Sequence, residues 1–119
     1  MIRLFFLLLA FIHAIPALAA VAPGSLTRLY GVPASDSALL TLLQHRAVLF
    51  ALLAGALVLA AFRPDLRWPA LVAVSVSMAS FLLIAALRGE LSGSLRSIVV
   101  ADVAELLIAL LAATLVLRS

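Results

Sequence analysis

The run from Leu39 to Ala61 most constrains the fold, because it is apolar and long enough to cross a bilayer. Near its start it carries three consecutive polar residues, Gln44, His45 and Arg46. A charge inside a membrane helix costs roughly 2.5–3.5 kcal/mol on insertion scales, so it normally faces protein or water. We therefore expect Arg46 to be enclosed by other helices and to find a partner there.

The composition extends this interpretation to the whole chain. Of the 119 residues, 67% are apolar and only 11% are charged, whereas an ordinary soluble domain is about a quarter charged. The absence of cysteine excludes disulfides, thiolate metal sites and cysteine nucleophiles. All the basic residues are arginines, dispersed near the ends of apolar runs. We expect them to anchor helices at the membrane surface and expect no nucleic-acid partner.

Four apolar runs predict a single membrane domain of the all-α class, a four-transmembrane-helix bundle with short loops. They lie at about residues 2–22, 39–62, 69–88 and 95–117. The first run also resembles a signal peptide, with Arg3 before it, a break at Pro16 and a small-residue motif at 17–19. Because it is also long enough to span the bilayer, we expect it to be retained.

The connection at 23–38 is the one sizeable loop between these runs. Its residues Leu26, Leu29 and Tyr30 recur at helical spacing, which predicts a short amphipathic helix on the membrane surface. Ser35, Asp36 and Ser37 are candidate N-caps for the helix that follows, and Asp36 also suits its positive end.

The arginines also bear on topology. With four spans, the amino terminus, the turn near 63–68 and the carboxyl terminus share one side of the membrane. That side holds Arg3, Arg63, Arg67 and Arg118, whereas the other side holds Arg28, Arg88 and Arg96. The small excess predicts cytoplasmic termini in a bacterial inner membrane.

Polar residues from all four spans fall at a similar depth. At about 1.5 Å per residue, Arg46 and Asp102 each lie about 10 Å inside their helices, and Glu105 one turn deeper. Counted from the same side, His13 lies about 13 Å deep and Ser80 about 12 Å. We expect Arg46 to pair with Asp102 or Glu105. The predicted binding cluster consists of His13, Gln44, His45, Arg46, Ser80, Asp102 and Glu105.

Several interpretations of this cluster stay open. A single ion pair to Arg46 would only fix the helix register. The second carboxylate is not needed for that purpose, which favours a hydrated pocket for a small ligand. Haem ligation by His13 and His45, and metal binding by the histidines and acids, are further alternatives. We expect no cofactor, no metal and no catalytic residue, because the sequence lacks a phosphate loop, an HExxH motif and a nucleophile elbow.

These residues together resemble a group of small bacterial membrane proteins with a DoxX-like four-helix arrangement. The resemblance covers most of the chain in short motifs: His13 followed by Pro16, Leu29-Tyr30-Gly31-Val32, His45-Arg46 and Val100-Ala101-Asp102. Similar sequences sometimes bear the name phosphopantetheine adenylyltransferase. That enzyme needs a nucleotide-binding α/β domain with a histidine-glycine-histidine type motif, and this chain has neither. Adenylyltransferase activity is therefore not expected.

We expect an accessory or small-ligand-binding membrane protein. Its partners would be the lipid bilayer and either another membrane protein or further copies of the chain. The alternative class is a redox component that handles a quinone or haem, or a proton-coupled transport component. The DoxX resemblance implies a link to quinone-dependent sulfur oxidation, but no residue here carries that chemistry over.

Overall fold

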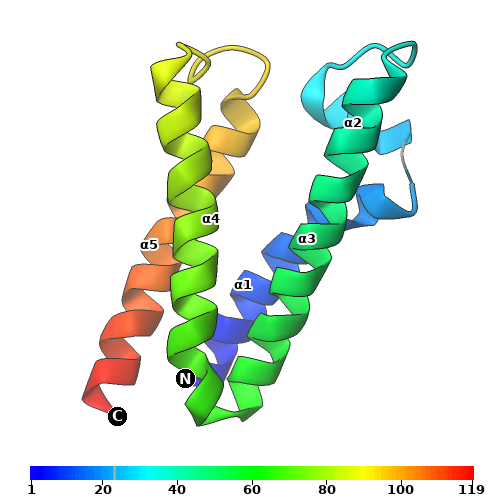
Figure 1. Ribbon diagram of the computed structural model, residues 1–119. Helices are drawn as coiled ribbons and strands as arrows, with labels where there is room; N and C mark the ends of the chain where they lie inside the picture. Colours follow the sequence, from blue (N-terminus) through cyan, green and yellow to red (C-terminus); the bar gives the residue numbers. More distant parts are fainter. Residues whose placement is uncertain (23) are drawn as a thin grey trace.

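Four long helices run alternately up and down in the computed structural model, which describes residues 1–22 and 24–119 (Figure 1). The elements are α1 (Ile2–Ala17), the 3₁₀ turn η1 (Leu18–Ala20), α2 (Gly24–Tyr30), α3 (Ser37–Phe62), the 3₁₀ turn η2 (Pro64–Leu66), α4 (Arg67–Leu87) and α5 (Arg96–Arg118). The prediction of an all-helical fold with four spans is confirmed. Pro23, the first residue of the expected loop, lies outside the described residues.

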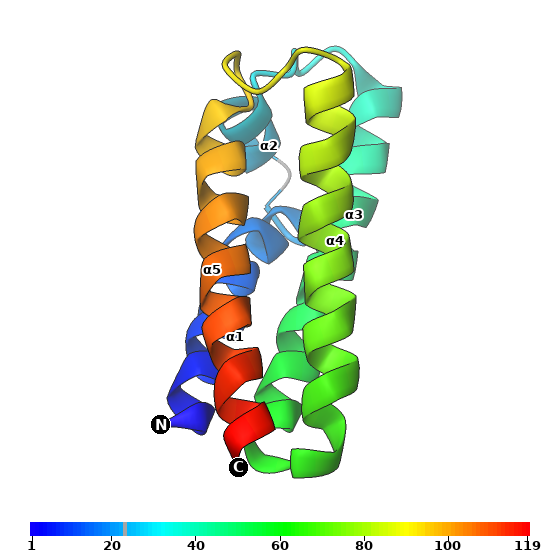
Figure 2. The same ribbon diagram turned by 90° about the vertical axis from the view of Figure 1, so that its left-hand side faces the viewer.

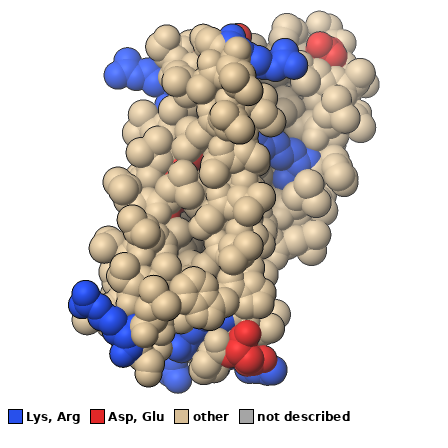
Figure 3. Space-filling model, turned by 60° about the vertical axis from the view of Figure 1, so that its left-hand side comes forward, with Lys and Arg blue, Asp and Glu red and all other residues tan. Residues whose placement is uncertain are grey.

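The helices have the length and surface of membrane spans. The segments Ile2–Ala20, Ser37–Phe62, Pro64–Leu87 and Arg96–Arg118 are long and apolar enough to cross a membrane. The molecule extends 49 Å along its longest axis, which exceeds the hydrocarbon thickness of about 30 Å. Large side chains such as Leu4, Leu52 and Leu110 are exposed along the helices. Most of the basic side chains visible in Figure 3 lie at the two ends, with one basic patch between them. Together these features indicate a multi-pass membrane protein.

The two chain ends and the η2 turn lie at one end of the bundle, and the two other connections lie at the opposite end (Figures 1 and 2). We call these the terminal end and the loop end. At the terminal end, Arg3 lies over the ring of Phe62, 5.7 Å from its centroid. This places the start of α1 beside the end of α3, so the two helices are antiparallel.

Local sequence explains where the helices begin and end. Asp36 caps α3, because its Oδ1 accepts a hydrogen bond from the Leu39 N–H at 3.1 Å. Of the three candidates, Asp36 is therefore the residue that caps this helix. Gly31 and Gly89, with φ of 66° and 70°, follow α2 and α4 in the left-handed conformation that favours glycine. Pro16 lies inside α1 and has no N–H to donate, and the helix tightens into η1 just after it.

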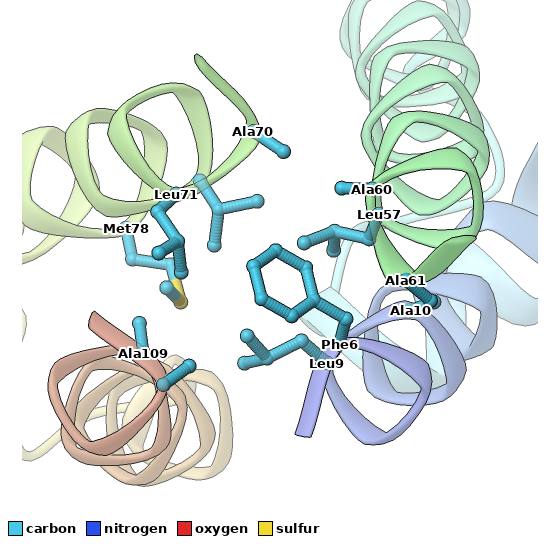
Figure 4. Packing of buried hydrophobic residues seen from close by; sticks show 12 residues of the cluster. Phe6, Leu9, Ala10, Leu57, Ala60, Ala61, Ala70, Leu71, Met78 and Ala109 are labelled. Carbon is cyan, nitrogen blue, oxygen red and sulfur yellow. The ribbon is translucent and has the colours of Figure 1, made fainter. Parts of the chain in front are cut away.

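An apolar core fills the terminal half of the bundle (Figure 4). Phe6 and Leu9 of α1 meet Leu57 of α3, and Met78 of α4 approaches Ala109 of α5. Most of the remaining members are alanines, which allow the four helices to approach closely. In this half, the apolar core therefore holds all four long helices together.

A second, smaller cluster closes the loop end. Leu26 and Tyr30 of α2 are buried together with Val32, Ala19 and Ala47. The short helix expected at this position is present, and its apolar side faces the bundle. The α2 segment thus covers the upper part of α1 and α3 and supplies residues to the polar region described next.

Candidate functional site

His13 on α1 and Glu105 on α5 meet above the apolar core. The Nδ1 atom of His13 lies 3.1 Å from Oε1 of Glu105 and also 3.1 Å from the carbonyl oxygen of Leu9. Only the contact with the Leu9 carbonyl has hydrogen-bond geometry, so Nδ1–H donates to that carbonyl. The Glu105 carboxylate lies close to the imidazole without a directed hydrogen bond.

Both acids of α5 face the interior. Asp102 and Glu105 are one turn apart and are 6% and 4% exposed, as expected for residues that share a helix face. Ala109 and Ala112 continue this face into the apolar core. The sequence therefore located the polar face of α5 correctly.

Two buried polar atoms lack a partner among the residues that the structure describes. They are Nε2 of His13 and Oε1 of Glu105. Leaving a buried donor or acceptor without a partner costs about 1–3 kcal/mol. Such atoms are usually satisfied by water or by a bound molecule.

A cavity of about 190 Å³ is lined in part by His13 and Glu105, whose Nε2 and Oε1 atoms are themselves enclosed. Its walls come from α1, α2, α3 and α5: Ile12, His13, Ile15, Pro16, Leu29, Tyr30, Phe50, Ser97, Ile98, Ala101, Asp102 and Glu105. A protein cavity of about 150 Å³ is large enough for benzene. The space, which we call the His13 pocket, therefore has room for a small ring and has polar groups on one side.

The predicted ion pair of Arg46 is not formed. No carboxylate of the described chain lies within 4.0 Å of its guanidinium, and the buried acid–base contact involves His13 instead. Counting residues from helix ends gave a similar depth but did not fix the rotation of α3. That rotation turns Arg46 away from α5 and toward α4.

Aromatic rings surround Arg46 in place of an acid. Its guanidinium carbon lies 4.8 Å from the ring centroid of Phe81, 5.0 Å from that of Phe50 and 5.7 Å from that of Tyr30. At these distances cation–π attraction stabilises the charge. Arg46 also lines a groove between α3 and α4, which we call the Arg46 groove.

Phe50 separates the two spaces. Its ring lies 5.7 Å from the His13 ring on one side and 5.0 Å from the Arg46 guanidinium on the other. It lines both the His13 pocket and the Arg46 groove. One helical turn of α3, from Arg46 to Phe50, thus connects the two polar regions.

The remaining predicted residues lie apart from the His13 pocket. Gln44 donates from Nε2 to the carbonyl oxygen of Ala20 at 2.8 Å, which ties α3 to the end of η1. His45 is exposed on the outer side of α3. Ser80 lines the Arg46 groove and donates to the Ser77 carbonyl at 2.9 Å. The structure thus divides the predicted residues between two spaces: His13, Asp102 and Glu105 line the His13 pocket, and Arg46 and Ser80 line the Arg46 groove.

The structure adds aromatic residues that the sequence interpretation did not place in the site. Phe50 follows Arg46 by four residues, a spacing that puts both on one helix face and was a usable signal. Phe81 and Tyr30 come from separate elements, and nothing local links them to Arg46. Burial raises the pKa of the Tyr30 phenol, although the nearby Arg46 charge opposes this shift.

The positions of the two histidines bear on the haem alternative. His13 is buried in the pocket, whereas His45 points outward from another helix. Within one chain the two imidazoles do not share a space in which a haem could lie between them. In the described part of the chain, no three His, Asp or Glu residues are grouped closely enough to hold a metal ion.

Comparison of the chain with protein-family models, curated proteins and solved structures finds no match.

Proposed function

We propose that the chain is a DoxX-like small-ligand-binding protein of the bacterial inner membrane, with both termini in the cytoplasm. The ligand would enter the His13 pocket from the bilayer or from the loop end. The resemblance of its short motifs to those of DoxX-like proteins, together with the four apolar helices, supports the proposed membrane location. The pocket itself supports the binding role.

The observation that carries the proposal is the pair of unpartnered polar atoms beside a ring-sized space. A pocket whose walls are mainly apolar, with a few convergent polar groups, is typical of small-molecule sites. Here the apolar walls include Ile12, Ile15 and Phe50, and the polar side holds His13 and Glu105. A purely structural His–Glu contact would not need an adjoining cavity.

The hydrogen-bonding state of the site indicates the class of ligand. With its Nδ1–H directed to the Leu9 carbonyl, a neutral His13 presents Nε2 as an acceptor. Oε1 of the Glu105 carboxyl group, which receives no hydrogen bond, is also an acceptor. Both atoms can therefore accept a hydrogen bond from a ligand, and a ring that carries a hydroxyl group supplies the donor. We propose a phenol-like or quinol-like head as the ligand.

Fluorine NMR on the protein in detergent micelles tests this proposal. The probes are 4-fluorophenol and 4-fluorotoluene, which have similar rings but differ in the hydroxyl donor. We expect saturable binding of 4-fluorophenol, at least tenfold tighter than that of 4-fluorotoluene, because a buried site built for a hydroxyl penalises its loss.

Two alanines of α5 provide matched variants. Ala101 lines the pocket and Ala104 is exposed without lining it. Ala101→Phe should abolish 4-fluorophenol binding and Ala104→Phe should leave it unchanged. Equal binding of the two probes, or equal binding in the two variants, would contradict the proposal.

Quinol oxidation or proton transfer is a second candidate, which the same acceptors favour. In that case a quinol would pass two electrons to a redox protein partner in the membrane and release two hydroxyl protons, for which the imidazole and the carboxylate are the candidate acceptors. In the same NMR assay, an unlabelled hydroquinone should displace 4-fluorophenol, whereas its dimethyl ether should not. Displacement by both compounds, or by neither, would count against this candidate.

A further inference from the structure

We propose that the Arg46 groove is a second site, which binds the carboxylate head of a lipophilic acid from the bilayer. The groove lies between α3 and α4, where Figure 1 shows α3 leaning away from α4 toward the loop end. This site is separate from the His13 pocket and does not depend on the function proposed for it.

The charge of Arg46 is held in place but is not neutralised by a contacting acid. The rings of Tyr30, Phe50 and Phe81 fix the guanidinium group by cation–π contact. The described residues place no carboxylate within 4.0 Å of it and form no hydrogen bond to it that meets ordinary geometry. A guanidinium presents a planar fork of donors that matches a carboxylate. The arrangement therefore has a donor set ready for an external anion.

The groove has the shape and lining for an amphiphile. Its volume is about 360 Å³, and it is lined by Arg46, Leu49, Phe50, Leu53, Ser77, Ser80, Phe81 and Ile84. Leu49, Leu53 and Ile84 provide apolar surface on which a hydrocarbon chain can lie. The Ser80 hydroxyl is engaged with the Ser77 carbonyl, so Arg46 is the dominant donor.

Charge and depth favour a carboxylate over a phospholipid phosphate. One arginine matches the single charge of a carboxylate. Arg46 lies about 13 Å along α3 from Ser37 at about 1.5 Å per residue, within a segment apolar enough to span the hydrocarbon layer, whereas phosphate groups belong to the polar headgroup region. A single-chain acid can bring its small head to this depth, whereas a phospholipid would have to bring its glycerol backbone as well.

Native mass spectrometry of the protein released from detergent micelles tests the site, because it counts the molecules that stay bound. The probes are hexadecanoate, its methyl ester and a dioleoyl phosphatidic acid. We expect hexadecanoate to be retained at least tenfold more than the ester. Arg46→Gln should lower hexadecanoate retention at least tenfold, since charge-assisted hydrogen bonds are lost, and Arg46→Lys should fall between the two proteins.

Three controls make the result specific. Arg88→Gln removes an exposed arginine at the loop end and should leave retention unchanged. Ala101→Phe, which fills the His13 pocket, should also leave it unchanged, so that failure of the pocket proposal does not affect this one. The comparison of acid and ester on the unaltered protein stays decisive even if Arg46→Gln misfolds. Equal retention of acid and ester, equal loss in Arg88→Gln, or retention of phosphatidic acid in place of hexadecanoate would each overturn the assignment.

Discussion

His13 on α1 and Glu105 on α5 form a buried contact, with Nδ1 and Oε1 3.1 Å apart and both side chains almost fully enclosed. At the η2 turn, Arg63 and Asp65 form a contact of nearly the same length, 3.0 Å, with both side chains more than half exposed. The exposed pair makes two directed hydrogen bonds and the buried pair makes none, so the buried contact depends on its enclosed surroundings. Because the cost of losing a partner rises with burial, they are expected to respond differently to substitution.

Removing one member of the buried pair should destabilise the protein strongly. Glu105→Leu leaves the imidazole without the carboxylate beside it, and losing a polar contact in a buried site typically costs about 1–3 kcal/mol. Replacing both residues, as in His13→Leu with Glu105→Leu, should recover much of that loss, because apolar groups of similar volume suit the same space. Thermal unfolding in detergent, followed by circular dichroism, measures the single and double variants.

The exposed pair is the control for this experiment. Arg63→Leu, Asp65→Leu and their combination should all unfold close to the temperature of the parent, since solvent screens the contact. If Glu105→Leu were as stable as Asp65→Leu, the His13–Glu105 contact would contribute nothing to the fold.

Arg46 should behave unlike a member of an ion pair. Its aromatic contacts at 4.8–5.7 Å are together expected to contribute about 0.5–2 kcal/mol, so Arg46→Leu should cost no more than that. No carboxylate contacts Arg46, but its charge still attracts that of Asp102 from a greater distance. Combining this change with Asp102→Leu should therefore show only a weak coupling of about 0.5 kcal/mol. The same unfolding assay in detergent checks this, and coupling well above that value would restore the Arg46–Asp102 pair expected from the sequence.

The helices could be predicted because the pattern that identifies each one lies within a single continuous stretch of the sequence. A run of apolar residues with arginines at its ends identifies a span regardless of its neighbours. The Asp36 cap is a local signal of the same kind. The alternation of four spans then places the chain ends and the η2 turn together, without any knowledge of side-chain contacts.

The site could be predicted only in part. Counting residues gives the depth of a side chain along its helix, but it does not give the direction in which the side chain points from the helix axis. Residue counting put His13, Arg46 and Glu105 near one level, but α3 presents Arg46 to Phe81 on α4, while α5 presents Glu105 to His13 on α1. His45, next to Arg46 in sequence, turns outward for the same reason. The packing of the alanine-rich core determines how each helix is rotated about its axis. Each helix has several apolar faces of similar size that could pack there, so the sequence does not show which one does.

The arrangement of the two ends predicts the topology. Reporter fusions at Ser35 and Ser92, which lie at the loop end, should report one side of the membrane, and a fusion at Asp65 should report the other. The arginine distribution further predicts that Asp65 is cytoplasmic. A fusion at Asp65 that agreed with the one at Ser35 would rule out the up-and-down arrangement.

Tyr30 offers a spectroscopic measurement of the covered loop end, because it is the single tyrosine of the chain. Burial raises the pKa of its phenol, and Arg46 partly opposes this. We expect the phenolate absorbance in detergent to appear with a midpoint above the ordinary value of about 10, and to move higher still in Arg46→Leu. Since the raised pKa belongs to the folded state, the associated stability is fully present below the unfolded pKa and is lost as the pH rises through the folded pKa. A midpoint at or below the ordinary value would show that Tyr30 is open to water and that α2 does not cover the bundle. A midpoint that did not move in Arg46→Leu would show that the guanidinium does not lie beside the phenol ring.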